Sequence, residues 1–174
     1  MLGFFIDGKP MGKERRTKQG YTPPQTRRYE AKARKAFMEQ CGASSVIEGP
    51  VAVAWMAVFP VPKSWSKKKK RLAWDQDMPH TQKPDVDNIE KIILDSLNHT
   101  FLWEDDCYVN NSIGFKRFAK EGEEAGVYVW LFESYITQEW FDWILKELER
   151  REQRGKVAKN GLSSDRGYGA SRDG

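Results

Sequence analysis

Two groups of aspartates are the residues best suited to chemistry in this chain. Asp85 and Asp87 lie in the segment HTQKPDVDN, and Asp106 ends the acidic group WEDD. Hard cations such as Mg²⁺ are bound by a few carboxylates together with water and substrate phosphate oxygens. A bound metal lowers the pKa of water and neutralises charge that develops on a phosphoryl group. The acids therefore predict metal-dependent phosphodiester hydrolysis, provided that the fold brings them together.

The residues around these acids predict how they are held. Pro84 favours an extended residue before it, and Asp87 stands where the N-cap of a helix over Asp87–Asn98 belongs. An extended backbone through Val86 would point the two carboxylates to the same side. The helix would carry a polar stripe of Asp87, Lys91 and Asp95 opposite its apolar face. The second acidic group follows in the connection to the next strand, where a chain reversal is expected to return it to the N-terminal end of the helix.

Lys91, one helical turn after Asp87, is a candidate for stabilising charge or orienting the nucleophile. Each of these residues also has an ordinary structural interpretation. Asp87 alone fits a helix cap, and Lys91 alone fits an ion pair with Asp87 at i,i+4 spacing. Glu104–Asp106 alone fits an acidic turn. The motif residues therefore carry the functional hypothesis only in combination.

Basic residues dominate the N-terminal part of the chain. Between Lys9 and Lys35 there are ten Lys or Arg against two acids, and the loop Lys9–Gln25 is rich in Gly and Pro. This pattern favours an anionic partner and predicts a flexible basic arm that contacts DNA phosphates rather than bases. The candidate DNA-binding residues are Lys13, Arg15, Arg16, Lys18, Arg27 and Arg28.

The hydrophobic pattern predicts an α+β fold, with a small mixed sheet of about four strands and helices packed on it. Apolar and β-branched runs predict strands over Leu2–Ile6, Val51–Val61, Val109–Phe118 and Val127–Glu133, the last two joined as a hairpin through Glu121–Gly126. Helical spacing predicts helices over Thr26–Cys41, Asp87–Asn98 and, as an added C-terminal helix, Thr137–Arg154. The basic segment Lys63–Trp74 is expected to be a short helix with Ser66 as its N-cap, or a loop.

Length and composition set the remaining expectations. The 174 residues, of which 39% are hydrophobic, have room for one ordinary domain. We expect that domain over residues 1–135, a C-terminal helix over 136–154 packed on it or on a partner, and a disordered tail over 155–174. No apolar stretch approaches the roughly 20 residues of a membrane span. The two cysteines predict neither zinc nor disulfides, so a cytoplasmic protein is expected.

The order of the motifs resembles the RusA family of phage and bacterial Holliday-junction resolvases. KPDxDNxxK is followed by a D-x-L-N helix end and a W-x-D-D turn, and the start GKPMGKERR with YTPPQTRRYE is also similar. The similarity covers about residues 3–133. It implies that Asp85, Asp87 and Asp106 bind Mg²⁺, with Mn²⁺ able to substitute, and that Lys91 is needed for cleavage. It further implies an α+β homodimer that binds branched DNA, the four-way junction above all.

The resemblance thus predicts a crossover-junction endodeoxyribonuclease that acts by paired nicking in DNA recombination and repair, in a prophage-type member of the family. Two features depart from shorter members, namely the basic insert Lys63–Trp74 and everything after Ser134. Two alternatives remain open. The basic residues alone suit a DNA-binding module without catalysis. The Trp-rich segment around Trp140 and Trp143 suits a purely structural partner.

Overall fold

The computed structural model describes residues 1–42, 47, 49–98, 100, 102–103, 106–133, 142 and 146. The chain divides into two compact units, residues 1–135 and 136–174, and every element below belongs to the first. The predicted helix over 137–154 and the predicted tail lie outside the described residues, apart from Asp142 and Lys146. None of the described helices is long and apolar enough to cross a bilayer.

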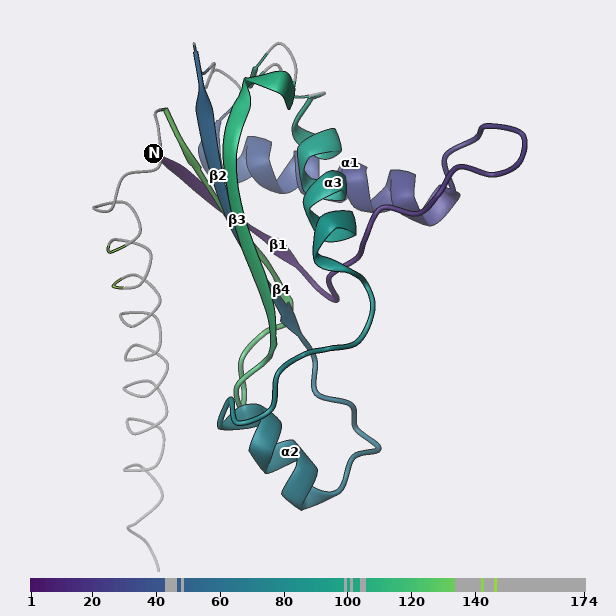
Figure 1. The fold of residues 1–174 in the computed structure, drawn as a ribbon, viewed down its shortest axis with the longest axis vertical. Helices are drawn as coiled ribbons and strands as arrows, with labels where there is room; N and C mark the ends of the chain where they lie inside the picture. Colours follow the sequence, from purple (N-terminus) through teal and green to yellow (C-terminus); the bar gives the residue numbers. More distant parts are fainter. Residues whose placement is uncertain are drawn as a thin grey trace, which may run out of the picture. The chain divides into compact units, whose positions relative to one another are not determined.

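Four strands form one mixed sheet in the order β1-β4-β2-β3 (Figure 1). They are β1 (Leu2–Asp7), β2 (Val51–Phe59), β3 (Val109–Phe118) and β4 (Gly126–Phe132). β4 pairs antiparallel with both β1 and β2, whereas β3 pairs parallel with β2. The predicted α+β class and the four-stranded mixed sheet are confirmed.

The predicted hairpin between the last two strands is wrong. β3 and β4 are consecutive in the chain, but β2 lies between them in the sheet. All nine residues of β2 are buried. A strand that is apolar on both faces buries the most apolar surface at the centre of a sheet, because neighbouring strands also cover both of its edges there. The apolar pattern of each strand predicted the strand itself, but it did not predict which strand is its neighbour in the sheet.

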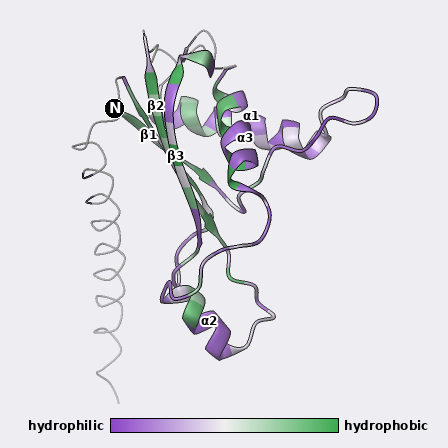
Figure 2. Ribbon diagram, in the orientation of Figure 1, coloured by the Kyte–Doolittle hydropathy of each residue, from purple (hydrophilic) through white to green (hydrophobic). Residues whose placement is uncertain are grey.

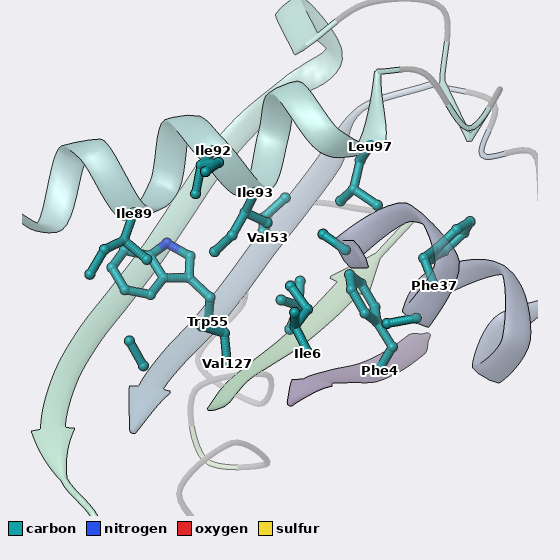
Figure 3. Close-up of a cluster of buried hydrophobic side chains, with 14 of the residues drawn as sticks. Phe4, Ile6, Phe37, Val53, Trp55, Ile89, Ile92, Ile93, Leu97 and Val127 are labelled. Carbon is teal, nitrogen blue, oxygen red and sulfur yellow. The ribbon is translucent and has the colours of Figure 1, made fainter. Parts of the chain in front are cut away.

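Helices α1 (Pro24–Cys41) and α3 (Val86–Leu97) lie on the same side of the sheet in Figure 1. In Figure 3 the apolar side chains of α3 point towards the strands, and Phe37 of α1 packs against Phe4 of β1 with ring centroids 5.5 Å apart. The buried residues of α3 include Ile89, Ile92, Ile93 and Leu97. Each such side chain contributes about 1.5–3 kcal/mol when fully buried. The core therefore anchors α3 firmly on the sheet.

The basic insert contains a helix, α2 (Lys67–Trp74), so the helical alternative of the two expected ones is confirmed. Ser66 is its N-cap, and the Ser66 hydroxyl accepts a hydrogen bond from the Lys69 amide at 3.3 Å. The Lys69 ammonium also lies 3.9 Å from the centre of the Trp65 ring. Figure 2 shows hydrophilic residues over much of α2 and over the loop that joins β1 to α1.

Candidate metal centre

The first aspartate pair lies at the N-terminal end of α3. Asp85 is the N-cap residue, with φ −72° and ψ 154°, and the helix begins at Val86. The predicted N-cap, Asp87, therefore lies inside the first turn, and Val86 is helical instead of extended. The Asp85 carboxylate makes no capping hydrogen bond to its own helix. An N-cap carboxylate that accepts no hydrogen bond from the amides of its helix has its oxygens available to bind another group.

The polar stripe predicted on α3 is present. Asp87 and Lys91 form an ion pair at 3.3 Å, and their side chains are 63% and 62% exposed. Asp85 is exposed as well, whereas Ile89, on the opposite side of the helix, is fully buried. An exposed pair of this kind adds little to stability, typically a few tenths of a kcal/mol. The carboxylates therefore face solvent at one end of a well-anchored helix.

The segment leading to Asp85 is held in place by β3. The Lys116 ammonium donates hydrogen bonds to the carbonyl oxygens of Gln82 at 2.7 Å and Pro84 at 2.8 Å. Sequence reasoning missed Lys116, because a lysine in a strand belongs to no recognisable motif. These hydrogen bonds link the C-terminal half of β3 to the residues just before α3.

His80 anchors the earlier part of the same segment. Its ring is buried and stacks on Phe59 at 3.9 Å, with Phe118 at 4.7 Å. Burial lowers the pKa of His80 from its ordinary value, and the nearby Lys116 ammonium lowers it further. The imidazole therefore favours its neutral form, which suits a ring packed between aromatic side chains.

The N-terminal loop packs directly against the start of α3. The Lys13 amide donates to the Asn88 carbonyl at 2.7 Å. A Cβ atom on Gly12 would lie 2.6 Å from Cβ of Pro84 and 3.1 Å from Cβ of Asn88. Only glycine allows this approach without displacement of one of the two backbones. Gly12 is a second residue that sequence reasoning missed, since a glycine in a Gly/Pro-rich loop carries no distinguishing signal.

Lys13 is part of the fold rather than of a flexible arm. Its ammonium forms ion pairs with Glu30 of α1 at 2.5 Å and with Asp95 of α3 at 2.7 Å. Burial alone would lower the pKa of Lys13, but the hydrogen bonds to Asp95 and Glu30 outweigh it and the pKa is raised. The predicted flexibility of the loop is therefore wrong at Lys13, and a phosphate contact by this residue stays a prediction.

The other predicted DNA-binding residues are exposed. The loop projects from the domain in Figure 1, and it is closed by a turn in which the Gly20 amide donates to the Thr17 carbonyl at 2.8 Å. Tyr21 beside this turn is 72% exposed, an aromatic group that the sequence analysis did not single out. The exposed basic residues are Arg15, Arg16 and Lys18 in the loop, and Arg27 and Arg28 on α1.

Asp106 is not brought to the other two acids within one chain. It begins the 3-10 turn η1 (Asp106–Tyr108), which directly precedes β3. The Trp103 indole donates to the Asn98 side chain at 2.6 Å, which ties this connection to the C-terminal end of α3. Within the described residues, no three Asp, Glu, His or Cys side chains are grouped so that they could hold a metal ion. The expected chain reversal is therefore wrong, and Glu104 and Asp105 lie outside the described residues.

Comparison with known proteins adds two findings. The family model described as Endodeoxyribonuclease RusA matches residues 7–131. A protein of Bacillus subtilis (strain 168), named Uncharacterized protein YqaN, is 36% identical over 104 residues, which cover 59% of this chain and 72% of that protein. The region matched by the family model contains all the motif residues described above.

Proposed function

Because the chain belongs to the RusA family of endodeoxyribonucleases, we propose that it resolves four-way DNA junctions by metal-dependent phosphodiester hydrolysis, in recombination and repair. The supporting observation is the Asp85 carboxylate at the start of α3, which makes no capping hydrogen bond. Two exposed carboxylates, Asp85 and Asp87, match the donor chemistry of Mg²⁺, which keeps several waters and takes only one or two protein carboxylates beside phosphate oxygens. Mn²⁺ is expected to substitute.

Asp85 and Asp87 would hold the metal. Asp106, which the resemblance also predicts as a ligand, follows the C-terminal end of α3, so its part in the same site stays a prediction. When bound, the metal would activate water and neutralise charge on the cleaved phosphate. Lys91, next to Asp87 on the exposed face of α3, would hold a positive charge beside the scissile phosphate and stabilise the transition state.

DNA would approach the same face along the basic loop. Gly12 and Lys13 contact the start of α3, so the exposed Arg15 and Arg16 extend from the candidate metal centre. Phosphate contacts from such residues orient a duplex without reading its sequence. Arg27 and Arg28, exposed on α1, would extend this basic surface.

We further propose that the enzyme acts as a homodimer, because resolution of a junction needs two nicks and a two-fold dimer supplies two identical sites. One observation favours a second candidate function, a DNA-binding module without catalysis. In the part of the chain that the structure describes, three acids are not grouped around one point. The two functions make opposite predictions for cleavage.

The decisive experiment incubates the purified protein with a synthetic four-way junction, a linear duplex and a single strand, each with Mg²⁺ and with EDTA. We expect nicking of the junction in Mg²⁺ alone. Asp85→Asn, Asp87→Asn and Asp106→Asn are expected to abolish nicking while junction binding survives, because each removes a carboxylate charge near phosphate. Asp77→Asn, at an exposed acid after α2, is the matched control and should remain active. Junction binding without any nicking by the unaltered protein would favour the DNA-binding module.

A further inference from the structure

The basic insert carries positive charge that the protein itself does not neutralise. The segment Lys63–Trp74 contains six Lys or Arg and no Asp or Glu. Arg71 has a carboxylate partner, Asp75, at 3.0 Å. Three other basic residues of α2 form no ion pair within the described residues, namely Lys67, Lys68 and Lys70. The insert is therefore a surface that attracts an anionic partner.

The charge lies where it opposes the stability of α2. The helix begins at Lys67, and its first turn contains lysines and no acid. The N-terminal end of a helix carries partial positive charge from its aligned peptide dipoles, so cations are unfavourable there. Lysines that only kept the protein in solution would lie as well at any other exposed position. Their concentration at this end of α2 favours a role in binding.

The helix is fixed to the domain on both sides of its basic turn. Before it, the Trp65 ring packs edge-on against Phe118 of β3, with ring centroids 5.2 Å apart. After it, Ala73 is fully buried, and the Gln76 side-chain amide donates to the Phe118 carbonyl at 3.1 Å. A preformed helix loses less conformational entropy on binding than a mobile loop does. The lysines are thus presented on a preorganised frame.

The same end of β3 anchors both α2 and the candidate metal centre. Lys116 holds the residues just before Asp85, and Phe118, two residues further along the strand, contacts the α2 segment. Two residues of an extended strand span about 7 Å. DNA that is bound at the start of α3 therefore passes close to the frame that carries the α2 lysines.

The basic loop and α2 extend from this centre in different directions. In Figure 1 the loop that joins β1 to α1 projects outward beyond α1 and α3, whereas α2 lies beyond the C-terminal ends of β2 and β3. Duplex DNA is stiff over such lengths, since its persistence length is about 150 base pairs. A straight duplex that follows one surface therefore leaves the other unoccupied, whereas a four-way junction has arms in several directions.

We propose that α2 binds the phosphate backbone of one arm of a four-way junction while the basic loop binds another arm. Lysines that contact phosphates need no particular base sequence. Binding of the second arm is intramolecular once the first is bound, and this raises the affinity for a junction above that for a linear duplex. The inference rests on the proposed function and adds which surface makes the chain select branched DNA.

Lys67→Gln/Lys68→Gln tests the α2 surface through binding in EDTA, where no cleavage occurs. Glutamine has nearly the helix propensity of lysine, so α2 is retained. For a junction, we expect the slope of log affinity against log salt to fall by about 0.9 per lost phosphate contact, which weakens binding about 8-fold per contact at about 0.1 M salt. Affinity for a linear duplex should fall about twofold or less, because the duplex still binds along the loop. Lys67→Arg/Lys68→Arg should keep the wild-type slope.

Lys32→Gln/Lys35→Gln is the matched control, because it removes the same formal charge from α1. Each of these lysines already has a carboxylate partner, Asp7 at 2.9 Å and Glu39 at 3.6 Å. The control should therefore keep a slope close to that of the wild type. An unchanged slope in the α2 variant, or an equal fall in the control, would overturn the inference. Equal losses for junction and duplex would mean that α2 and the loop follow the same arm, and would overturn it as well.

Cleavage by hydroxyl radicals locates each surface on the DNA. Iron–EDTA is attached through a cysteine at an exposed position beside each surface, Ser64→Cys before α2 and Gln19→Cys in the loop. Both variants are made in a Cys41→Ser/Cys107→Ser background, which removes the natural thiols. We expect the two probes to break strands on different arms of the junction. Breaks on the same arm would overturn the inference.

Vesicles of phosphatidylserine and phosphatidylcholine test another polyanion for α2. Binding of these vesicles by the wild type but not by Lys67→Gln/Lys68→Gln, together with an unchanged DNA slope, would assign α2 to a membrane surface and overturn the inference. The failure of the proposed function has a different signature. A wild-type protein that neither prefers nor nicks a junction would contradict the proposed function, whereas nicking by the wild type with no effect of the α2 substitutions would overturn the inference alone.

Discussion

Lys116→Met removes the ammonium group whose hydrogen bonds to the carbonyls of Gln82 and Pro84, at 2.7 and 2.8 Å, hold the residues before Asp85. Hydrogen bonds to charged groups contribute about 1.5–3 kcal/mol each when water is excluded. Gln82 is exposed and Pro84 half-buried, so water replaces much of what is removed. We therefore expect the free energy of unfolding to fall by about 1–2 kcal/mol in total.

The effect on cleavage should exceed the effect on stability. The segment carries a proposed metal ligand, and a displacement of about 1 Å in a catalytic group can cost about 100-fold in rate. We expect junction nicking at limiting Mg²⁺ to fall about 10- to 100-fold, with partial recovery at higher Mg²⁺. Urea unfolding measures the stability, and single-turnover nicking over a range of Mg²⁺ concentrations measures the rate.

Lys68→Met is the matched control, because Lys68 is exposed on α2 and its replacement removes the same charge. Any general loss of attraction to DNA appears in both variants, whereas a positioning role appears only in Lys116→Met. Lys116→Arg should restore part of the activity, since its guanidinium also donates to carbonyls. Equal stability and equal Mg²⁺ dependence in the two methionine variants would refute the positioning role of Lys116.

Three further predictions follow from other parts of the structure. Gly114→Ala should lower the free energy of unfolding, measured in urea, by about 1–3 kcal/mol or more, because overpacked cores are destabilised by that much. The new Cβ would lie 1.8 Å from the buried Trp55 ring. Wild-type stability would contradict this packing. The folded-state pKa of His80 is lowered, so protonation favours the unfolded chain, and stability should fall as pH drops below the ordinary value of 6.5. His80→Phe should weaken that dependence, and an unchanged pH profile of melting temperature would exclude His80 as its source. Arg15→Gln with Arg16→Gln should reduce the slope of log affinity against log salt by about 0.9 for each duplex phosphate that the variant no longer neutralises, and an unchanged slope would mean that neither arginine binds phosphate.

The sequence alone determined the local features of this protein. The spacing of Ile89, Ile93 and Leu97 predicted an amphipathic helix, and α3 buries that face. Apolar runs predicted all four strands of the sheet, with β3 matching its predicted bounds of Val109–Phe118. These features were readable because helical and strand periodicities depend on residues close together in the chain. The start of α3 was predicted wrongly, because both Asp85 and Asp87 are of a residue type that favours the N-cap. The helix begins after the first of them.

Only the tertiary structure decided how these elements meet. Strand order depends on contacts between distant residues, and the insertion of β2 between β3 and β4 leaves no trace in the pattern of either neighbour. The contacts of Lys116 and Gly12 with the segment before α3 likewise join residues far apart in sequence. Asp106 stands a whole helix away from Asp85, because α3 and β3 run in opposite directions and the connection between them lies at the far end. The residue types therefore predicted the chemistry of the acids, but not the distance between Asp106 and the other two acids. That distance is set by how the elements pack, and not by the number of residues between the acids in the sequence.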